Sequence, residues 1–359
     1  MKLLACSVAF LVLLAAPAQG ATLAQRADAG DGRASLELAN AAREAHQEAS
    51  ALRWYRRAGF LGNADGAYGK AYMVQYGEGT KPDPAYAREL YARAANLGSA
   101  HAAYQLGYMA QMGVGGPRDR AEARVQYERA VGRGDAQAMF GLGTLLWLDT
   151  SDHAEGLKWF RRADAAATPV ERLYIKEAYI YLGRATTSTS QAAAYFRKGT
   201  DLGEPLCCLE LADATLKGRG VPRDEDAAEA LYIKAEGLVP VDETDRLAPA
   251  SAWLGQRALG RGDGEMARHW LELGADAGVL PAQRALVDLY APGKPLANNA
   301  KAYMWASIAA DAGDPMAWVV RWGMDRSFPE GDRTEGAALA KSWHVAHPRA
   351  IPSPGHKTP

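Results

Sequence analysis

Residues 99–134 read SAHAAYQLGYMAQMGVGGPRDRAEARVQYERAVGRG and contain two helical patterns on either side of a glycine-rich break. In each half, small or apolar residues recur every three or four positions, as on one face of a helix. Gly113, Gly115 and Pro117 interrupt the pattern, and Asp119 offers an acceptor to the first turn of the second helix. Because neither helix can bury its apolar face alone, the stretch predicts a helical hairpin.

The hairpin pattern recurs along the chain, and a glycine closes each copy. The closing glycines are separated by 36, 36, 69, 75 and 35 residues: Gly62, Gly98, Gly134, Gly203, Gly278 and Gly313. Each long interval fits two copies, with a degenerate closing residue between them. A repeat of this length is typical of a solenoid, in which each hairpin buries its apolar face against its neighbours.

Small residues stand at fixed distances from the closing glycines. Four residues after them lie Gly66, Ala102, Ala138, Cys207, Ala282 and Ala317. Four residues before them lie Ala58, Ala94, Ala130, Gly199, Gly274 and Ala309. Larger side chains would push two helix backbones apart, so both sets predict close contacts between helices.

These features resemble the Sel-one-like repeat (SLR) family, a branch of the tetratricopeptide-like helical solenoids. The resemblance rests on three motifs: AYQLGYMAQMGVGG at 103–116, GRGVPRDEDAAEALYIKA at 218–235 and AYMWASIAADAG at 302–313. Shorter turns replace the glycine loop within 135–203 and 241–278. The resemblance implies an all-α fold, a right-handed α-solenoid of about eight to nine stacked helix-turn-helix repeats.

The first 20 residues have the features of a secretory signal peptide. Lys2 supplies the positive start, residues 3–16 are almost wholly apolar, and Ala18 and Gly20 are small residues at the cleavage site. We expect a mature chain that starts at Ala21, has no membrane span and resides in the bacterial periplasm or is secreted. An uncleaved anchor is the second interpretation. Cys6 completes a lipoprotein-like box, but no apolar segment precedes it as such a signal requires.

The mature chain is expected to divide into a lead, a solenoid and a tail. Residues 21–33 show no clear periodicity and predict a flexible lead, and residues 349–359 are too rich in proline to pack. Within the solenoid, residues 34–348, we expect a first helix pair, then four, two and two repeats: 34–63, 64–203, 204–278 and 279–348.

Charge and motifs argue against nucleic acid, cofactors and catalysis. The 41 basic and 42 acidic residues form no long stretch of one sign, whereas a nucleic-acid partner requires a basic face. The sequence contains no HExxH motif, no cysteine pair with zinc spacing and no nucleophile elbow. His344, His347 and His356 offer a metal-site hypothesis, but we interpret them as solvated residues near the end of the chain.

Other reactive residue types have structural interpretations. Asp83, Asp119 and Asp224 each stand before a second helix, so we interpret them as helix caps rather than catalytic carboxylates. Cys207 and Cys208 are adjacent, which leaves a strained disulfide or a redox switch as hypotheses. We favour two small, reduced, buried residues.

Two classes of function remain after these exclusions. The first, which we favour, is a non-enzymatic scaffold or adaptor of the bacterial cell envelope that binds a partner protein, a peptide or a polysaccharide along a concave solenoid face. The family resemblance supports it, because SLR proteins commonly act as adaptors. The alternative is a cell-wall-binding protein or a β-lactamase-like hydrolase. The relatives linked to that activity carry a disulfide in each repeat, which this sequence lacks.

The resemblance also implies that one face of each first helix lines the concave surface. With Leu106 and Gly107 as the reference for helical spacing, this face carries aromatic residues with glutamines beside them. The residues are Tyr68, Tyr72, Gln75, Tyr104, Tyr108, Gln111, Phe140 and Trp147. Aromatic rings give a large contact area, and glutamine bonds a peptide backbone or a sugar hydroxyl. Tyr68, Tyr104 and Phe140 share one register and fit stacking in the core equally well. The corresponding Leu209 and Asp213 lack aromatic character, so binding is expected in the N-terminal half.

Overall fold

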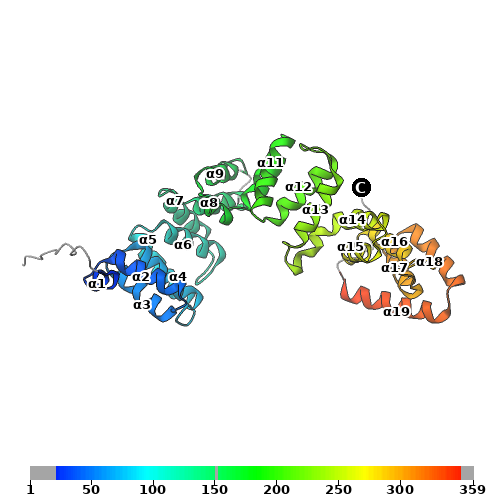
Figure 1. The fold of residues 1–359 in the computed structure, drawn as a ribbon, viewed down its shortest axis with the longest axis horizontal. Helices are drawn as coiled ribbons and strands as arrows, with labels where there is room; N and C mark the ends of the chain where they lie inside the picture. Colours follow the sequence, from blue (N-terminus) through cyan, green and yellow to red (C-terminus); the bar gives the residue numbers. More distant parts are fainter. Residues whose placement is uncertain (1–21, 150–152, 349–359) are drawn as a thin grey trace, which may run out of the picture. The chain divides into compact units, whose positions relative to one another are not determined.

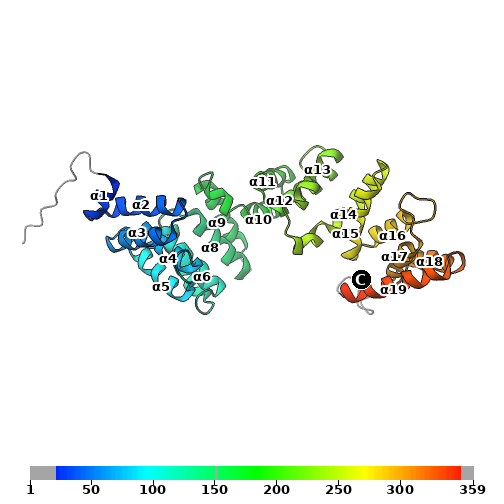
Figure 2. The same cartoon turned by 60° about the horizontal axis from the view of Figure 1, so that its bottom comes forward.

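The computed structural model describes residues 22–149 and 153–348, and no β-strand occurs among them. The expected signal peptide and the expected disordered tail lie outside these residues. The chain divides into two compact units, Met1–Ala178 and Tyr179–Pro359, which Figures 1 and 2 show from two directions. The all-α fold expected from the sequence is confirmed.

The described part of the first unit contains α1 (Leu23–Asp28), α2 (Gly32–Glu44), α3 (Glu48–Phe60), α4 (Ala64–Tyr76), α5 (Pro84–Asn96), α6 (Ala100–Met112), α7 (Arg120–Val131), α8 (Ala136–Asp149), α9 (His153–Ala166) and the 3-10 helix η1 (Glu171–Tyr174). From α2 onward these α-helices pair as antiparallel hairpins (Figure 1).

The described part of the second unit contains α10 (Ala178–Ala185), α11 (Thr189–Asp201), α12 (Pro205–Lys217), α13 (Glu225–Glu236), the 3-10 helix η2 (Val241–Leu247), α14 (Ala248–Gly260), α15 (Gly264–Asp276), α16 (Leu280–Leu289), α17 (Asn299–Asp311), α18 (Pro315–Ser327) and α19 (Glu330–Ala346). None of the helices in the described ranges has the length and apolar content needed to cross a membrane.

The closing glycines have the backbone conformation that their position requires. All six have φ between 74° and 109°, a left-handed conformation that glycine adopts without steric cost. Except at Val279, the side chain of the next residue caps the following helix. The Asp135 carboxylate, for example, accepts a 2.8 Å hydrogen bond from the backbone amide of Ala138. Asp83, Asp119 and Asp224 cap their second helices in the same way. Their interpretation as helix caps is therefore confirmed.

The two sets of small residues meet each other between hairpins. A Cβ added to Gly66 would lie 2.4 Å from Cβ of Ala58, on the second helix of the preceding hairpin. Where the first helix carries the larger Cys207, the preceding second helix carries Gly199, and a Cβ there would lie 2.3 Å from the Cys207 sulfur. The predicted close contacts are confirmed, and the two sets are the two halves of one contact.

Second-helix aromatic rings lie against first-helix glycines on both sides. The ring of Tyr127 contacts Gly107 in its own hairpin and Gly141 in the next, where added Cβ atoms would lie 2.6 and 2.8 Å from it. Phe160 contacts Gly143 in the same manner, with an added Cβ 2.7 Å from the ring. The Tyr127 ring therefore joins two successive hairpins, and the Phe160 ring joins the two helices of its own hairpin.

The second glycine of each glycine loop packs on the preceding hairpin. Gly113 ends α6 with φ 74°, whereas Gly115 faces the start of α5, where an added Cβ would lie 2.4 Å from the carbonyl oxygen of Pro84. Gly220 faces the start of α11 in the same way, 2.1 Å from the oxygen of Thr189. The loop therefore has a packing role that only glycine can fill.

Basic side chains reach back to the C-terminal ends of earlier helices. Arg129 donates a 2.8 Å hydrogen bond to the Ala95 carbonyl at the end of α5, and Lys234 donates one of 3.0 Å to Thr200 in α11. Each of these carbonyls also accepts a hydrogen bond from the amide of the closing glycine, Gly98 at 3.0 Å and Gly203 at 3.2 Å. The negative end of the helix dipole favours the added cation.

The flexible lead expected over residues 21–33 is wrong for its described part. α1 has a capping box between Thr22 and Gln25, and Arg57 donates a 3.1 Å hydrogen bond to the Ala27 carbonyl. Gly30 has φ 94°, so it closes α1 as the other closing glycines close their helices. α1 therefore takes the place of a second helix. A helix of six residues is too short to show an apolar period in the sequence.

The last expected repeat is not a regular hairpin. α18 and α19 both pack on α17, which Figures 1 and 2 show at one end of the second unit. The ring of Trp343 in α19 lies 5.8 Å from that of Trp305 in α17, and its indole nitrogen donates a 2.7 Å hydrogen bond to Asp276. Two repeats over residues 279–348 are therefore reduced to one repeat, α16 and α17, followed by two helices packed on α17.

Cys207 and Cys208 are free and fully buried in α12, as expected. Burial raises the pKa of both thiols. The sulfhydryl of Cys208 donates a 3.3 Å hydrogen bond to the Leu231 carbonyl in the second helix of the same hairpin.

Candidate functional site

Three aromatic residues of the expected concave face pack against the core. Tyr68, Tyr104 and Phe140 are half-buried, and each packs on a second-helix ring of its own hairpin at centroid distances of 5.7, 6.0 and 5.6 Å. Burial raises the pKa of Tyr68 and Tyr104. Their common register therefore serves packing between the two helices of a hairpin.

The two amides of the expected face also bond within the fold. The Tyr91 hydroxyl donates a 2.8 Å hydrogen bond to the amide oxygen of Gln75, and Tyr127 donates one of 2.7 Å to Gln111. Gln75 is only 8% exposed, so its oxygen is committed to Tyr91. Gln111 is half-buried and faces solvent in part.

Three tyrosines near the ends of α4 and α6 remain accessible, and we call Tyr72, Tyr76 and Tyr108 the tyrosine face. Tyr76 is 54% exposed and Tyr108 is 40% exposed, while Tyr72 is half-buried. The rings of Tyr72 and Tyr76 lie 4.6 Å apart, and the Arg43 guanidinium lies 4.9 Å from the Tyr72 ring. Burial and the neighbouring Tyr72 and Tyr108 raise the pKa of Tyr76, so its hydroxyl remains a donor at neutral pH.

Tyr76 was not among the predicted residues. It follows Gln75 directly at the last position of α4, one position off the counted face. The four-residue spacing of Tyr68, Tyr72 and Tyr76 is the signal that identifies it, since such residues lie on one side of a helix.

A polar cavity adjoins the tyrosine face. It has a volume of about 530 Å³ and is lined by Asn40, Arg43, Glu44, His46, Glu48, Tyr55 and Glu78. Arg43 belongs to both surfaces, because its guanidinium pairs with Glu78 at 3.2 Å and also stacks on Tyr72. The accessible surface therefore combines aromatic rings with a polar hollow.

Phe140 and Trp147 are not part of the tyrosine face. Both pack on Phe160, at centroid distances of 5.6 and 6.3 Å, and Trp147 also stacks on His153 at 4.3 Å. These contacts assign the two rings to packing within the α8–α9 hairpin.

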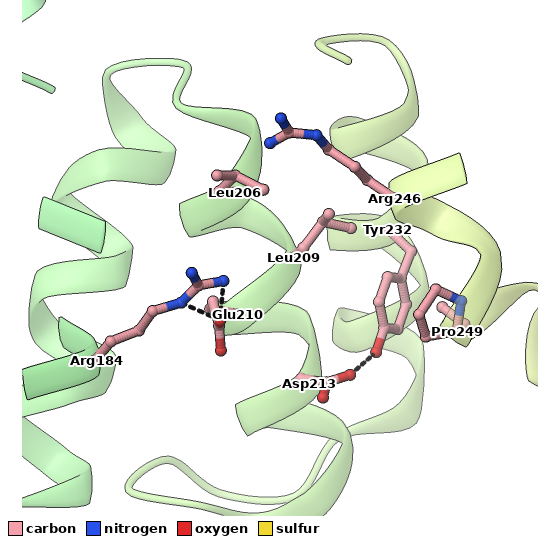
Figure 3. A pocket seen from close by; sticks show the side chains of 9 residues that line it. Arg184, Leu206, Leu209, Glu210, Asp213, Tyr232, Arg246 and Pro249 are labelled. Atoms are coloured by element: carbon pink, nitrogen blue, oxygen red, sulfur yellow. Dashed lines mark hydrogen bonds and ion pairs between the residues drawn. The ribbon is translucent and has the colours of Figure 1, made fainter. Parts of the chain in front are cut away.

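A second hollow lies in the second unit, at positions that the sequence analysis had set aside (Figure 3). It has a volume of about 310 Å³ and is lined by Arg184, Leu206, Leu209, Glu210, Asp213, Tyr232, Arg246, Pro249 and Ala250. Leu206, Leu209 and Asp213 correspond in register to His101, Tyr104 and Tyr108. The same helix face that carries tyrosines in α4 and α6 thus borders, in α12, a hollow lined by both apolar and charged side chains.

The polar groups in this hollow already have partners. Arg184 donates a 2.8 Å hydrogen bond to Glu210, and the Tyr232 hydroxyl donates to the Asp213 carboxylate (Figure 3). Burial opposes ionisation of Asp213, but hydrogen bonds from Tyr232 and Lys217 lower its pKa overall. Asp213 is therefore a paired carboxylate with a structural role.

The described residues contain no group of three or more His, Cys, Asp or Glu side chains placed to hold a metal ion. His344 lies 3.2 Å from Asp311, and His347 stacks on Trp343 at 4.7 Å, so the described histidines at the end of the chain contact the fold. His356 lies outside the described residues.

Solved structures with the same fold support this architecture. A protective antigen present in uropathogenic Escherichia coli strains, displaying an SLR fold, is 20% identical, with a TM-score of 0.58 over 94% of this chain and 83% of its own. A Sel1 repeat protein from Oxalobacter formigenes is 24% identical, with a TM-score of 0.57 over 67% of this chain and 96% of its own. No curated protein sequence matches the chain.

The Sel1 repeat pattern itself matches most of the helical stack. The matched residues are 46–63, 64–99, 100–135, 136–163, 205–236, 248–279 and 281–314. Their limits follow the hairpins and closing glycines described above. The chain belongs to the Sel1 repeat family.

Proposed function

We propose that this protein is a non-enzymatic scaffold of the bacterial cell envelope that binds an extended segment of a partner protein on its tyrosine face. Sel1 repeat proteins are generally protein-interaction scaffolds. The observation that carries the proposal is the accessible group of Tyr72, Tyr76 and Tyr108 beside a polar cavity. The other aromatic residues of the predicted face pack within hairpins.

The chemistry of this surface suits a peptide. Tyrosine rings supply contact area at low entropic cost, and their hydroxyls bond backbone carbonyls. Arg43 and the neighbouring Glu44, Glu48 and Glu78 offer both signs of charge at the cavity. An extended segment with one basic or acidic side chain directed into the cavity satisfies both features.

The envelope location rests on the first 20 residues of the sequence. Lys2, the apolar residues 3–16 and the small residues before Ala21 favour export and cleavage. Protein recovered from the cell envelope should have the intact mass of a chain starting at Ala21. A mass that includes Lys2, or a lipid-modified species, would reject this part of the proposal.

The binding site is tested by replacing Tyr72 and Tyr108 together with alanine. Tyr86 on α5 is a matched control, because it is also 40% exposed but lies outside the tyrosine face. We expect the double variant to lose capture of its partner from a periplasmic extract while the helical circular dichroism signal and the melting temperature stay nearly unchanged. A photo-crosslinking residue should capture the same partner at position 108 and not at position 86. Intact capture by the double variant would place the binding surface elsewhere.

A further inference from the structure

The hollow in the second unit has an apolar part that is open to solvent (Figure 3). Leu206 and Leu209 are half-buried there, and Pro249 beside them is exposed. The charged groups of the hollow are paired within the fold, as described above, and Arg246 pairs with Glu243 at 2.9 Å. A ligand that fits this hollow therefore offers apolar surface rather than a single buried charge.

The end of α19 is held against the end of α15. The Trp343 indole nitrogen donates a 2.7 Å hydrogen bond to Asp276, the last residue of α15. Nε2 of His347 lies 3.9 Å from the same carboxylate, and its ring stacks on that of Trp343. The sequence continues with residues 349–359, which we call the C-terminal segment and which lie outside the described residues. This segment therefore starts from the end of α15.

The end of α15 lies beside the start of α14, which borders the hollow. A Cβ added to Gly274 in α15 would collide with the Ser251 hydroxyl in α14. Pro249 and Ala250 directly precede Ser251 and line the hollow. Neighbouring helices lie about 10 Å apart, whereas six extended residues span about 20 Å. Residues 349–354 are therefore long enough to reach the hollow.

The charge of the C-terminal segment complements the surface beside the hollow. The segment reads RAIPSPGHKTP, with Arg349 and Lys357 near its two ends and no acidic residue. The helix η2 packs on α14 and α15 and carries three acidic side chains, Asp242, Glu243 and Asp245, against one arginine. Opposite charges on the two surfaces favour their approach.

A second hollow near the end of α19 has the opposite charge balance. It has a volume of about 440 Å³, and its lining residues include Arg321, Lys341 and His344. Asp311 is the one acidic side chain among the described residues that line it. A basic segment is disfavoured there, so charge directs the C-terminal segment toward η2.

The composition of the segment suits the surface of a helical stack. Ile351 is followed by Pro352, Ser353 and Pro354, and prolines exclude a helix but favour an extended polyproline conformation. Because this conformation is already restricted, less entropy is lost when the segment binds. Proline-rich segments of this kind bind apolar grooves that contain aromatic rings, such as the ring of Tyr232 in this hollow.

We propose that the C-terminal segment binds in the hollow of its own second unit. Residues 351–354 lie against Leu206, Leu209 and Pro249, and the basic side chains at the two ends lie near the acidic residues of η2. A segment on a short linker has an effective concentration on the order of millimolar, so even a millimolar intrinsic affinity fills about half of the hollows. The site is independent of the tyrosine face, which belongs to the first unit.

Photo-crosslinking of the purified protein tests this proposal. A benzophenone amino acid in place of Ile351 should label α12, η2 or the start of α14 within the same molecule. The same amino acid at Val345, which is 79% exposed on α19, is the matched control and should not label α12. Digestion of the monomeric product and mass spectrometry identify the labelled peptide, and the intact mass before irradiation confirms that residues 349–359 are present.

Charge reversal tests the orientation of the segment. Arg349→Glu combined with Lys357→Glu should lower the crosslink yield at least about threefold, because two exposed charge contacts are lost. Asp242→Lys combined with Asp245→Lys should have the same effect, since both carboxylates are exposed on η2. All four substitutions together should restore the yield, because the two surfaces are again complementary.

The control for charge reversal is Glu330→Lys combined with Glu335→Lys, which changes two exposed acidic residues at the start of α19 and should leave the yield unchanged. An equal loss in this control would contradict a specific contact with η2. Labelling from position 351 that misses α12, η2 and α14, or that joins two molecules, would also overturn the proposal. Circular dichroism of each variant confirms that the helices are intact.

Discussion

Tyr91 donates a hydrogen bond to Gln75 over 2.8 Å, and the pair links the two helices of one hairpin across their buried interface. One repeat later, Tyr127 and Gln111 form the same bond over 2.7 Å. The residues are sixteen apart in both pairs. A position that looks suited to ligand recognition in the sequence is therefore a recurring structural bond.

Tyr91→Phe should destabilise the protein by about 1–3 kcal/mol, because it leaves the buried oxygen of Gln75 without a donor. Tyr127→Phe should cost less, since water reaches the half-buried Gln111. Adding Gln75→Leu to Tyr91→Phe should recover much of the loss by removing the orphaned oxygen. Urea unfolding followed by circular dichroism measures all three. Equal losses for the two tyrosine variants would contradict the importance of burial at Gln75.

Gly199→Ala should also destabilise, by about 1–3 kcal/mol, because the new Cβ would stand 2.3 Å from the Cys207 sulfur. Ala102→Leu and Ala138→Leu act on the same contact in other hairpins and should show losses of similar size. Gly260→Ala is the control. It lies in the last turn of α14 with open space around its Cβ, so it should be neutral or slightly stabilising. Tolerance of all three larger substitutions would refute the close contact.

Thiol labelling of the native protein should be slow at Cys207 and Cys208. Both side chains are fully buried, and the raised pKa of each thiol lowers the thiolate fraction that reacts. Unfolding without a reductant should make both react at once. Two thiols that stay unreactive after unfolding would show that they are oxidised.

Stability should fall slightly as the pH rises through the titration of His101. Its Nδ1 lies 2.9 Å from the Asp135 carboxylate, and this hydrogen bond raises the pKa of His101 against the opposing effect of burial. A group with a raised folded-state pKa stabilises fully below its ordinary value of 6.5, and the contribution disappears above the raised value. The side chain is 52% exposed, so solvent screening keeps the effect below about 1 kcal/mol. Unfolding free energies of wild type and His101→Gln on both sides of this range measure it, and identical pH dependence would exclude the pair as its source.

The sequence predicted the features of the fold that depend on local chemistry. The closing glycines mark left-handed positions, and a small side chain is required wherever two helices cross closely, so both sets are visible as a period. Residues 23–28 escaped prediction because one short helix shows no period. The packing of α19 depends on which surface accepts it. The repeat pattern of the sequence does not show that surface, because α17 accepts both α18 and α19.

The sequence predicted which side of the helices carries the candidate site, but it did not predict which residues on that side are accessible. The spacing placed Tyr72 and Tyr108 on one side of α4 and α6, and both belong to the tyrosine face. The other predicted residues of this face contact side chains of the second helix. The sequence pattern of the first helix does not contain these partners, so it could not show which residues stay accessible. The Phe160 ring packs against the rings of Phe140 and Trp147, and the Tyr91 hydroxyl donates a hydrogen bond to Gln75.

The ring of Tyr127 is shared by two hairpins, since it lies against Gly107 on one side and Gly141 on the other. The smallest unit that contains all contacts of this ring therefore includes parts of two neighbouring hairpins. Because Gly62, Gly98 and Gly134 are spaced at 36 residues, a gene that gained or lost 36 codons anywhere in this region would rejoin each ring to an equivalent pair of helices. Unequal recombination need not respect hairpin boundaries to yield a folded product, so the length of such a protein can change during evolution while its contacts persist.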